Sequence, residues 1–118
     1  MARHLVVKVT CGADDPERAN QALTVAAMAL TAGAEVSLWL TGEAAWLGAG
    51  RGGFALAEAA SPADLVAAVL AAGRVTVCTQ CAARRELTED DLLPGVRIAG
   101  AAAYVEEVLG PDVQALVY

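Results

Sequence analysis

Two kinds of segment alternate along this chain. Short runs of aliphatic and β-branched residues are typical of buried strands, and longer stretches with apolar residues every three or four positions are typical of amphipathic helices. The predicted strands are His4–Thr10, Glu35–Leu40, Val75–Cys78, Val96–Ala99 and Val113–Tyr118. The predicted helices cover 16–32, 61–72 and 101–109, and the segments 79–85 and 88–93 are each predicted to form a short helix or turn.

Local signals set the ends of the longer helices. Asp14, Asp15 and Pro16 form a helix start, because an acidic cap and a proline in the first turn favour that position, and Gly33 ends the helix. Ser61 and Pro62 form a second start of the same kind. The least regular segment, 41–60, is predicted to hold a short helical piece around Trp46 followed by a mobile glycine-rich flap.

Strands that alternate with helices indicate an α/β fold. We expect residues 1–118 to form a single domain, with a mostly parallel five-stranded sheet and helices on both faces. The chain has 118 residues, of which 57% are hydrophobic, so it is long and apolar enough to bury a core without disulfides or metals.

Charge and apolar length exclude several classes of protein. The formal net charge is −6, whereas a nucleic-acid partner requires clustered Lys and Arg. The most apolar stretch, Ala22–Ala34, is shorter than the roughly 20 residues that cross a bilayer, and no segment resembles a signal peptide. We therefore predict a cytoplasmic protein without a nucleic-acid or membrane partner.

Three cysteines are the main candidates for chemistry. In open parallel sheets, sites form beyond the carboxyl ends of the strands. Cys11 follows the first strand and Cys78 closes the third, so the two share one edge of the sheet if those strands are neighbours. His4 starts its strand, at the opposite end, and is therefore a poor base for Cys78.

The strongest motif is the pair Cys78 and Cys81 in the run Cys-Thr-Gln-Cys. A cysteine where a strand turns into a helix lies near free backbone N–H groups, and the positive end of the helix favours the thiolate, which is the reactive form. Arg84 and Arg85 follow on the same segment and add positive potential. The layout suits thiol, disulfide or persulfide chemistry, with Cys78 and Cys81 as reacting groups and Cys11, Arg84 and Arg85 as supporting residues.

Other interpretations compete for these residues. Cys11 fits equally well as a small buried apolar residue. A structural zinc site needs four ligands, and only three cysteines and the distant His4 are available, so we predict no metal and no other cofactor. A thioredoxin-like arrangement disagrees with the late position of the cysteine pair.

Several further features favour structural roles. The glycine run 48–53 lacks the ending of a phosphate loop and is better interpreted as a flap. The acidic pairs Asp90-Asp91 and Glu106-Glu107 are predicted to form solvated helix faces. Trp46 and Phe54 either close over the cysteine edge or belong to the core.

The run Val75–Cys78, followed by Ala82, Ala83, Arg84 and Arg85, resembles the signature of the DsrE/DsrF/TusD-type sulfur-relay family, with its YchN-like fold. In that family an apolar strand ends in a carrier cysteine, and an arginine pair often follows. The closing segment 100–109 is similar to the family's last helix, and the resemblance covers nearly the whole chain. Cys81 lies outside the usual pattern, and Glu86 stands where a glycine often follows the arginine pair.

The resemblance implies a small sulfurtransferase-like carrier. Cys78 matches the carrier position and would accept sulfane sulfur as a persulfide, and Cys81 would attack that persulfide to release sulfide. The partners would be persulfide donor and acceptor proteins, and the carrier would assemble as a dimer, trimer or hexamer. The alternatives are a non-catalytic binding or assembly module with the same fold and a Cys78–Cys81 dithiol–disulfide redox switch.

Overall fold

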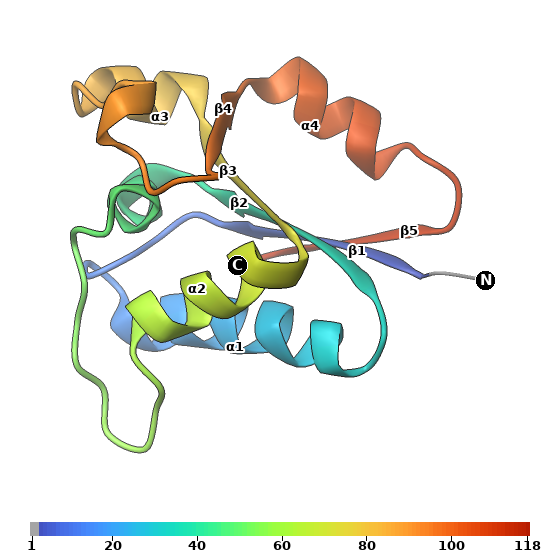
Figure 1. The fold of residues 1–118 in the computed structure, drawn as a ribbon, viewed down its shortest axis with the longest axis horizontal. Coiled ribbons are helices and arrows are strands. Elements are labelled where there is room, and N and C mark those ends of the chain that lie inside the picture. The colour runs from blue at the N-terminus through green and yellow to red at the C-terminus, as the bar shows by residue number, and fades with distance from the viewer. Residues whose placement is uncertain (1–2) are drawn as a thin grey trace.

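The computed structural model describes residues 3–118 and is built on one five-stranded sheet (Figure 1). Its strands run parallel in the order β4-β3-β2-β1-β5. Their bounds are β1 His4–Val9, β2 Glu35–Leu40, β3 Arg74–Cys78, β4 Arg97–Ala99 and β5 Val113–Val117. The expected α/β class and five-stranded sheet are confirmed, and every strand pair is parallel.

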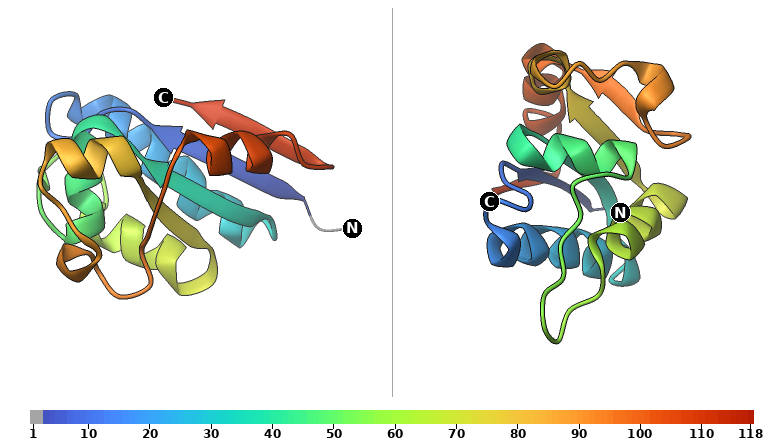
Figure 2. Two further views of the ribbon diagram at one scale, coloured as in Figure 1. Left: turned by 90° about the horizontal axis from the view of Figure 1, so that it is seen from above. Right: turned by 90° about the vertical axis from the view of Figure 1, so that its left-hand side faces the viewer.

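Helices cover both faces of this sheet, as predicted (Figures 1 and 2). The helices α1 (Pro16–Thr31) and α2 (Pro62–Ala72) pack side by side on one face, and α4 (Ala101–Val108) lies on the other. The short helix α3 (Thr79–Arg84) and the 3-10 helix η1 (Gly42–Ala49) pack together beyond the carboxyl ends of the strands. A second 3-10 turn, η2, spans Glu89–Asp91.

The predicted helix boundaries form through the expected side chains. Asp15 accepts a hydrogen bond from the Arg18 N–H at 3.4 Å at the start of α1, and Ser61 accepts one from the Asp64 N–H at 3.1 Å at the start of α2. Gly33 has φ of 90°, a left-handed conformation that glycine adopts at little cost, and it ends α1.

The two faces of the sheet differ in chemistry, because side chains alternate along each strand. Toward α1 and α2 the strands present fully buried aliphatic residues, such as Val7, Leu38 and Val77. Toward α4 they present Lys8, Trp39, Thr76 and Arg97, which are in register across β1, β2, β3 and β4. One face is therefore the main apolar core, and the other carries a polar row beneath α4.

Glu107 corrects one prediction from the sequence. It was expected on a solvated face with Glu106, but its side chain is only 12% exposed. Its carboxylate accepts hydrogen bonds from the Ser37 hydroxyl at 2.6 Å and from the Trp39 indole N–H at 3.4 Å, and it pairs with Arg97. The helix turns Glu107 onto the sheet while Glu106 stays exposed.

Trp46 and Phe54 both pack partly buried against the hydrophobic core, a cluster that also includes Cys81. The Arg51 guanidinium lies over the Trp46 ring, 4.5 Å from its centroid, and fixes the start of the loop that follows η1. That loop extends past α1 and α2, away from α3 (Figure 1).

Candidate functional site

Cys78 lies where β3 ends and α3 begins. It is the residue that caps α3, with extended backbone dihedral angles, and its side chain is half-buried. Along β3 it shares the α4 face of the sheet with Thr76, and it is in register with Ala99 of β4. Its sulfur is thus both supported by the sheet and reachable from solvent.

The surroundings of Cys78 favour its ionised form. Burial by itself raises the pKa of the Cys78 thiol, but hydrogen-bond donors around the sulfur outweigh that effect. The backbone N–H and the thiol of Cys81 lower the pKa, as do the backbone N–H of Gln80 and the ammonium of Lys8, so that the net pKa lies below the ordinary value. The Cys78 side chain makes no capping hydrogen bond to α3, but these N–H groups still favour its thiolate.

Cys81 is a buried thiol directly beside Cys78. It lies in the first turn of α3, is 8% exposed and makes no disulfide. Its sulfur accepts a hydrogen bond from the Gly42 N–H at 3.2 Å, and its side chain is one of the groups that lower the pKa of Cys78. The Cys81 thiol therefore lies between the start of η1 and Cys78.

The two arginines lie elsewhere than beside Cys78. Arg85 donates to the carbonyl of Cys81 at 3.1 Å, and its Nε lies 3.7 Å from a carboxylate oxygen of Glu43. Arg84 is exposed in the last turn of α3. Neither guanidinium contributes to the lowered pKa of Cys78. Arg85 instead links α3 to η1 through its ion pair with Glu43, so its role is structural.

Glu86 takes the backbone conformation of the glycine that it replaces. Its φ is 56°, and the N–H groups of Glu86 and Leu87 bond to the carbonyls of Ala83 and Ala82. These two bonds form the motif that commonly ends helices with a left-handed glycine. The turn after α3 therefore keeps its shape despite the glutamate.

Cys11 is not beside the cysteine pair. The condition that placed it near Cys78, adjacent first and third strands, is wrong, because β2 lies between β1 and β3. Cys11 is 5% exposed and belongs to the core. Burial raises the pKa of its thiol, and the nearby Asp15 and Asp14 raise it further. This environment favours the neutral thiol.

The sequence reasoning missed Lys8 and Glu107. Lys8 interrupts an otherwise apolar strand, and such a charge within a parallel sheet is a signal that could have been used. Its ammonium lies 5.0 Å from the centroid of the Tyr104 ring, and Tyr104 packs edge-on against Trp39 at 5.3 Å. The row beneath α4 is thus held by stacked cations and rings.

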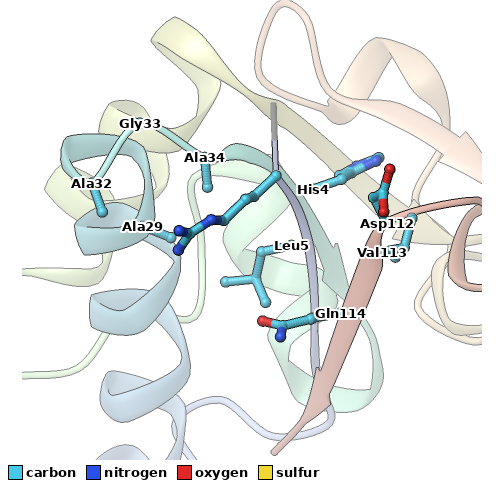
Figure 3. A pocket seen from close by; sticks show the side chains of 10 residues that line it. His4, Leu5, Ala29, Ala32, Gly33, Ala34, Asp112, Val113 and Gln114 are labelled. Atoms are coloured by element: carbon cyan, nitrogen blue, oxygen red, sulfur yellow. The ribbon is translucent and has the colours of Figure 1, made fainter. Parts of the chain in front are cut away.

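The largest cavity described lies at the other end of the sheet. It measures about 620 Å³, and its lining includes His4, Leu5, Ala29, Asp112 and Gln114 but no cysteine. In Figure 3, His4 and Asp112 lie side by side at this amino edge. The prediction that His4 is remote from Cys78 is confirmed, because the two residues occupy opposite ends of parallel strands.

Residues 3–118 contain no group of three or more His, Cys, Asp or Glu side chains arranged to hold a metal ion. None of their helices combines the length and the apolar character needed to span a membrane.

The site contains one nucleophilic thiol, that of Cys78, and a second, buried thiol next to it, that of Cys81. Cys78 is half-buried and its pKa is lowered, which favours the thiolate, the form that attacks electrophilic sulfur. The thiol of Cys81 lies beside Cys78 and can react with a disulfide or persulfide that forms on the Cys78 sulfur. A site of this kind can exchange disulfides or hold a sulfur atom.

Comparisons with known proteins match the fold of this chain. A model of the DsrE/DsrF-like family matches residues 4–110. Among solved structures, the ychN protein from E. coli superposes with a TM-score of 0.74 at 19% identity. A protein of unknown function, MTH1491 from Methanobacterium thermoautotrophicum, gives a TM-score of 0.67 at 11% identity. In both cases 100% of each chain is covered. A search of the curated proteins finds no match.

Proposed function

The chain belongs to the DsrE/DsrF-like family, and from that premise we propose that it is a sulfur carrier that holds sulfane sulfur as a persulfide on Cys78. The observation that carries the proposal is the half-buried side chain of Cys78 at the start of α3, whose pKa is lowered by the donors around it. Family members are linked to sulfur relay, which requires such a thiolate.

The carrier is loaded when one sulfur atom passes from a donor persulfide to Cys78. The Cys78 thiolate attacks the outer sulfur of a donor persulfide, and the S–S bond of the donor breaks as the new S–S bond forms. The donor leaves as its thiolate. The N–H groups of Gln80 and Cys81, which favour the Cys78 thiolate, also favour the anionic persulfide that replaces it.

Discharge has two routes. An acceptor thiolate can take the outer sulfur and regenerate the Cys78 thiolate. Alternatively, the Cys81 sulfur attacks the inner sulfur of the Cys78 persulfide, its proton passes to the outer sulfur, and HS⁻ leaves. That second route reduces the sulfane sulfur to sulfide and oxidises the two cysteines to a disulfide, which a dithiol reductant must then reopen. The position of the Cys81 side chain next to Cys78, where it lowers the pKa of that thiol, supports this route.

Mass spectrometry tests the carrier directly. After incubation with a low-molecular-weight persulfide donor, we expect a species heavier by one sulfur atom, located on the peptide that contains Cys78. The Cys78→Ser variant should lose the adduct and Cys11→Ser should retain it, because Cys11 is buried with a raised pKa. An adduct that persists in Cys78→Ser, or no adduct on the native protein, contradicts the proposal.

The contact between the two thiols also favours a dithiol–disulfide switch as a second candidate. That switch predicts a reversible Cys78–Cys81 bond with a measurable reduction potential and no sulfur adduct. Cys81→Ser distinguishes the two, since a carrier keeps its persulfide without Cys81 and a switch loses all its redox behaviour.

The setting of the carrier is part of the same proposal. It would work in the cytoplasm with a persulfide donor protein and an acceptor protein, as a homo-oligomer. Exposed apolar side chains on α4 and β5, among them Val105, Leu109 and Val117, support assembly.

A further inference from the structure

Lys8 is a charged residue in β1, an interior strand of the sheet, and it has no part in the sulfur-transfer steps described above. It lies between Val7 and Val9, both fully buried against α1 and α2, and so its side chain belongs to the opposite face of the sheet. Parallel sheets covered on both faces rarely carry charges in their interior strands. A lysine in this place calls for a partner of opposite charge.

That partner is not a carboxylate. Among residues 3–118, Lys8 forms no ion pair with a carboxylate. Its ammonium lies over the Tyr104 ring, 5.0 Å from the ring centroid. Glu107, the carboxylate that α4 turns onto this face, pairs instead with Arg97 and Arg74. Arg97 also donates to the Thr76 hydroxyl at 2.7 Å. Lys8 is therefore the cation of this face whose charge is still uncompensated.

The register places this charge on the side of Cys78. Lys8, Trp39 and Thr76 are aligned across β1, β2 and β3, and Cys78 comes two residues after Thr76 on the same face. Two strand spacings, about 10 Å between Cα atoms, separate Lys8 from Thr76, and the lysine stem shortens the distance from the charge itself. Trp39 lies between Lys8 and Thr76 in this row and packs edge-on against Tyr104, with the ring centroids 5.3 Å apart.

We propose that Lys8 is a positioning residue of the site, whose ammonium, held over Tyr104 on the Cys78 face of the sheet, stabilises the anionic sulfur at Cys78. The direction of the effect on the Cys78 pKa agrees with this assignment. The other charged or titratable groups around the site are Cys81, Arg84 and Arg85 on α3, Glu43 on η1, Tyr104 and Glu107 on α4, and Arg97 on β4, which is in register with Thr76. Arg85 and Glu43 neutralise each other, and Glu107 is paired on its own row. The inference rests on the proposed function only for the identity of the reacting sulfur.

The test is the pH profile of Cys78 alkylation by iodoacetamide, with the labelled peptide quantified by mass spectrometry. In Lys8→Met the midpoint of the profile should rise by about half a pH unit, and the rate at pH 7 should fall about threefold. Lys8→Arg keeps a cation over the ring and should restore the native profile. Arg84→Met removes the same charge from the exposed end of α3 and should leave the profile unchanged.

Two outcomes overturn the proposal: a Lys8→Met profile that superimposes on the native one, or an equal shift in Arg84→Met. Far-UV circular dichroism confirms that each variant is folded, and the Lys8→Arg comparison keeps the test decisive if Lys8→Met unfolds. Alkylation needs no persulfide donor. A failure of sulfur loading therefore leaves this result standing, and the two proposals can fail separately.

Discussion

At the scale of single residues, Glu86 shows how a side chain can depart from a pattern without changing the backbone. A left-handed conformation costs a non-glycine residue roughly 1–2 kcal/mol, yet the turn after α3 forms with both of its hydrogen bonds. Leu87, which follows, is buried and contributes to holding the turn closed. The cost at Glu86 is therefore offset by the packing of its neighbour.

We accordingly expect Glu86→Gly to be neutral or to stabilise the protein by up to about 1 kcal/mol, because relief of the left-handed strain exceeds the added chain entropy. Glu106→Gly is the matched control. Glu106 is exposed inside α4, where glycine costs about 1 kcal/mol relative to a good helix former. Urea unfolding measures both variants, and a loss of stability in Glu86→Gly equal to that in Glu106→Gly would refute the account of the turn.

The site residues differ in how far their positions could be predicted from the sequence. The spacing of Cys78 and Cys81, together with the start of a helix at Thr79, is local information, so their proximity was predictable from the sequence. Lys8 is 70 positions from Cys78 in the chain, and only the strand order brings the two onto one sheet face. Arg84 and Arg85 are close in sequence to Cys78, but the course of α3 carries them away from its sulfur.

At the scale of elements, α4 depends on one carboxylate for its attachment to the sheet. The helix has eight residues, none of them fully buried, so its apolar contribution is small. Glu107 compensates by bonding to β2 through Ser37 and Trp39 and to β4 through Arg97. Hydrogen bonds and ion pairs, more than burial, hold this helix in place.

Glu107→Gln should therefore destabilise the protein by about 2 kcal/mol, because it removes the charge opposite Arg97 and Arg74 in a poorly solvated site. Glu106→Gln, one position earlier and exposed, should change the free energy of unfolding by less than about 0.5 kcal/mol. Chemical denaturation measures both. Equal effects of the two substitutions would show that Glu107 does not anchor α4.

The same interaction has a pH signature. Burial raises the pKa of Glu107, but hydrogen bonds from Ser37 and Trp39 and the charge of Arg97 lower it more, so the folded-state pKa lies below that of the unfolded chain. The associated stability is then complete above the unfolded pKa and is lost as the pH falls through the folded one. The free energy of unfolding of Glu107→Gln, measured by chemical denaturation at several pH values, should therefore fall less steeply with decreasing pH than that of the native protein.

At the scale of the whole molecule, the exposed apolar residues gather around the β5 edge. β5 is a terminal strand with no charge in its sequence, and Val117 is 63% exposed. Leu109, at the end of α4, is 78% exposed. Unprotected edge strands and apolar patches of this kind favour association.

We expect light scattering to give a mass in solution that is a multiple of the 12.0 kDa chain. Leu109→Glu should shift the distribution toward the monomer, because it places a charge in the apolar patch. Met28→Glu is the control, since Met28 is also exposed but lies on α1. A native protein that is monomeric at all concentrations would refute this expectation.

The sequence alone determined the features that depend on neighbouring residues: the type of each element, the helix starts at Asp15 and Ser61, the end of α1 at Gly33, and the cysteine at the end of β3. It also determined the parallel α/β class, because the alternation of strands and helices leaves few other arrangements. Tertiary structure decided the strand order, which separates Cys11 from Cys78, and the side of α4 that meets the sheet, which buries Glu107. These features depend on contacts between residues far apart in the chain, and no local spacing encodes such contacts.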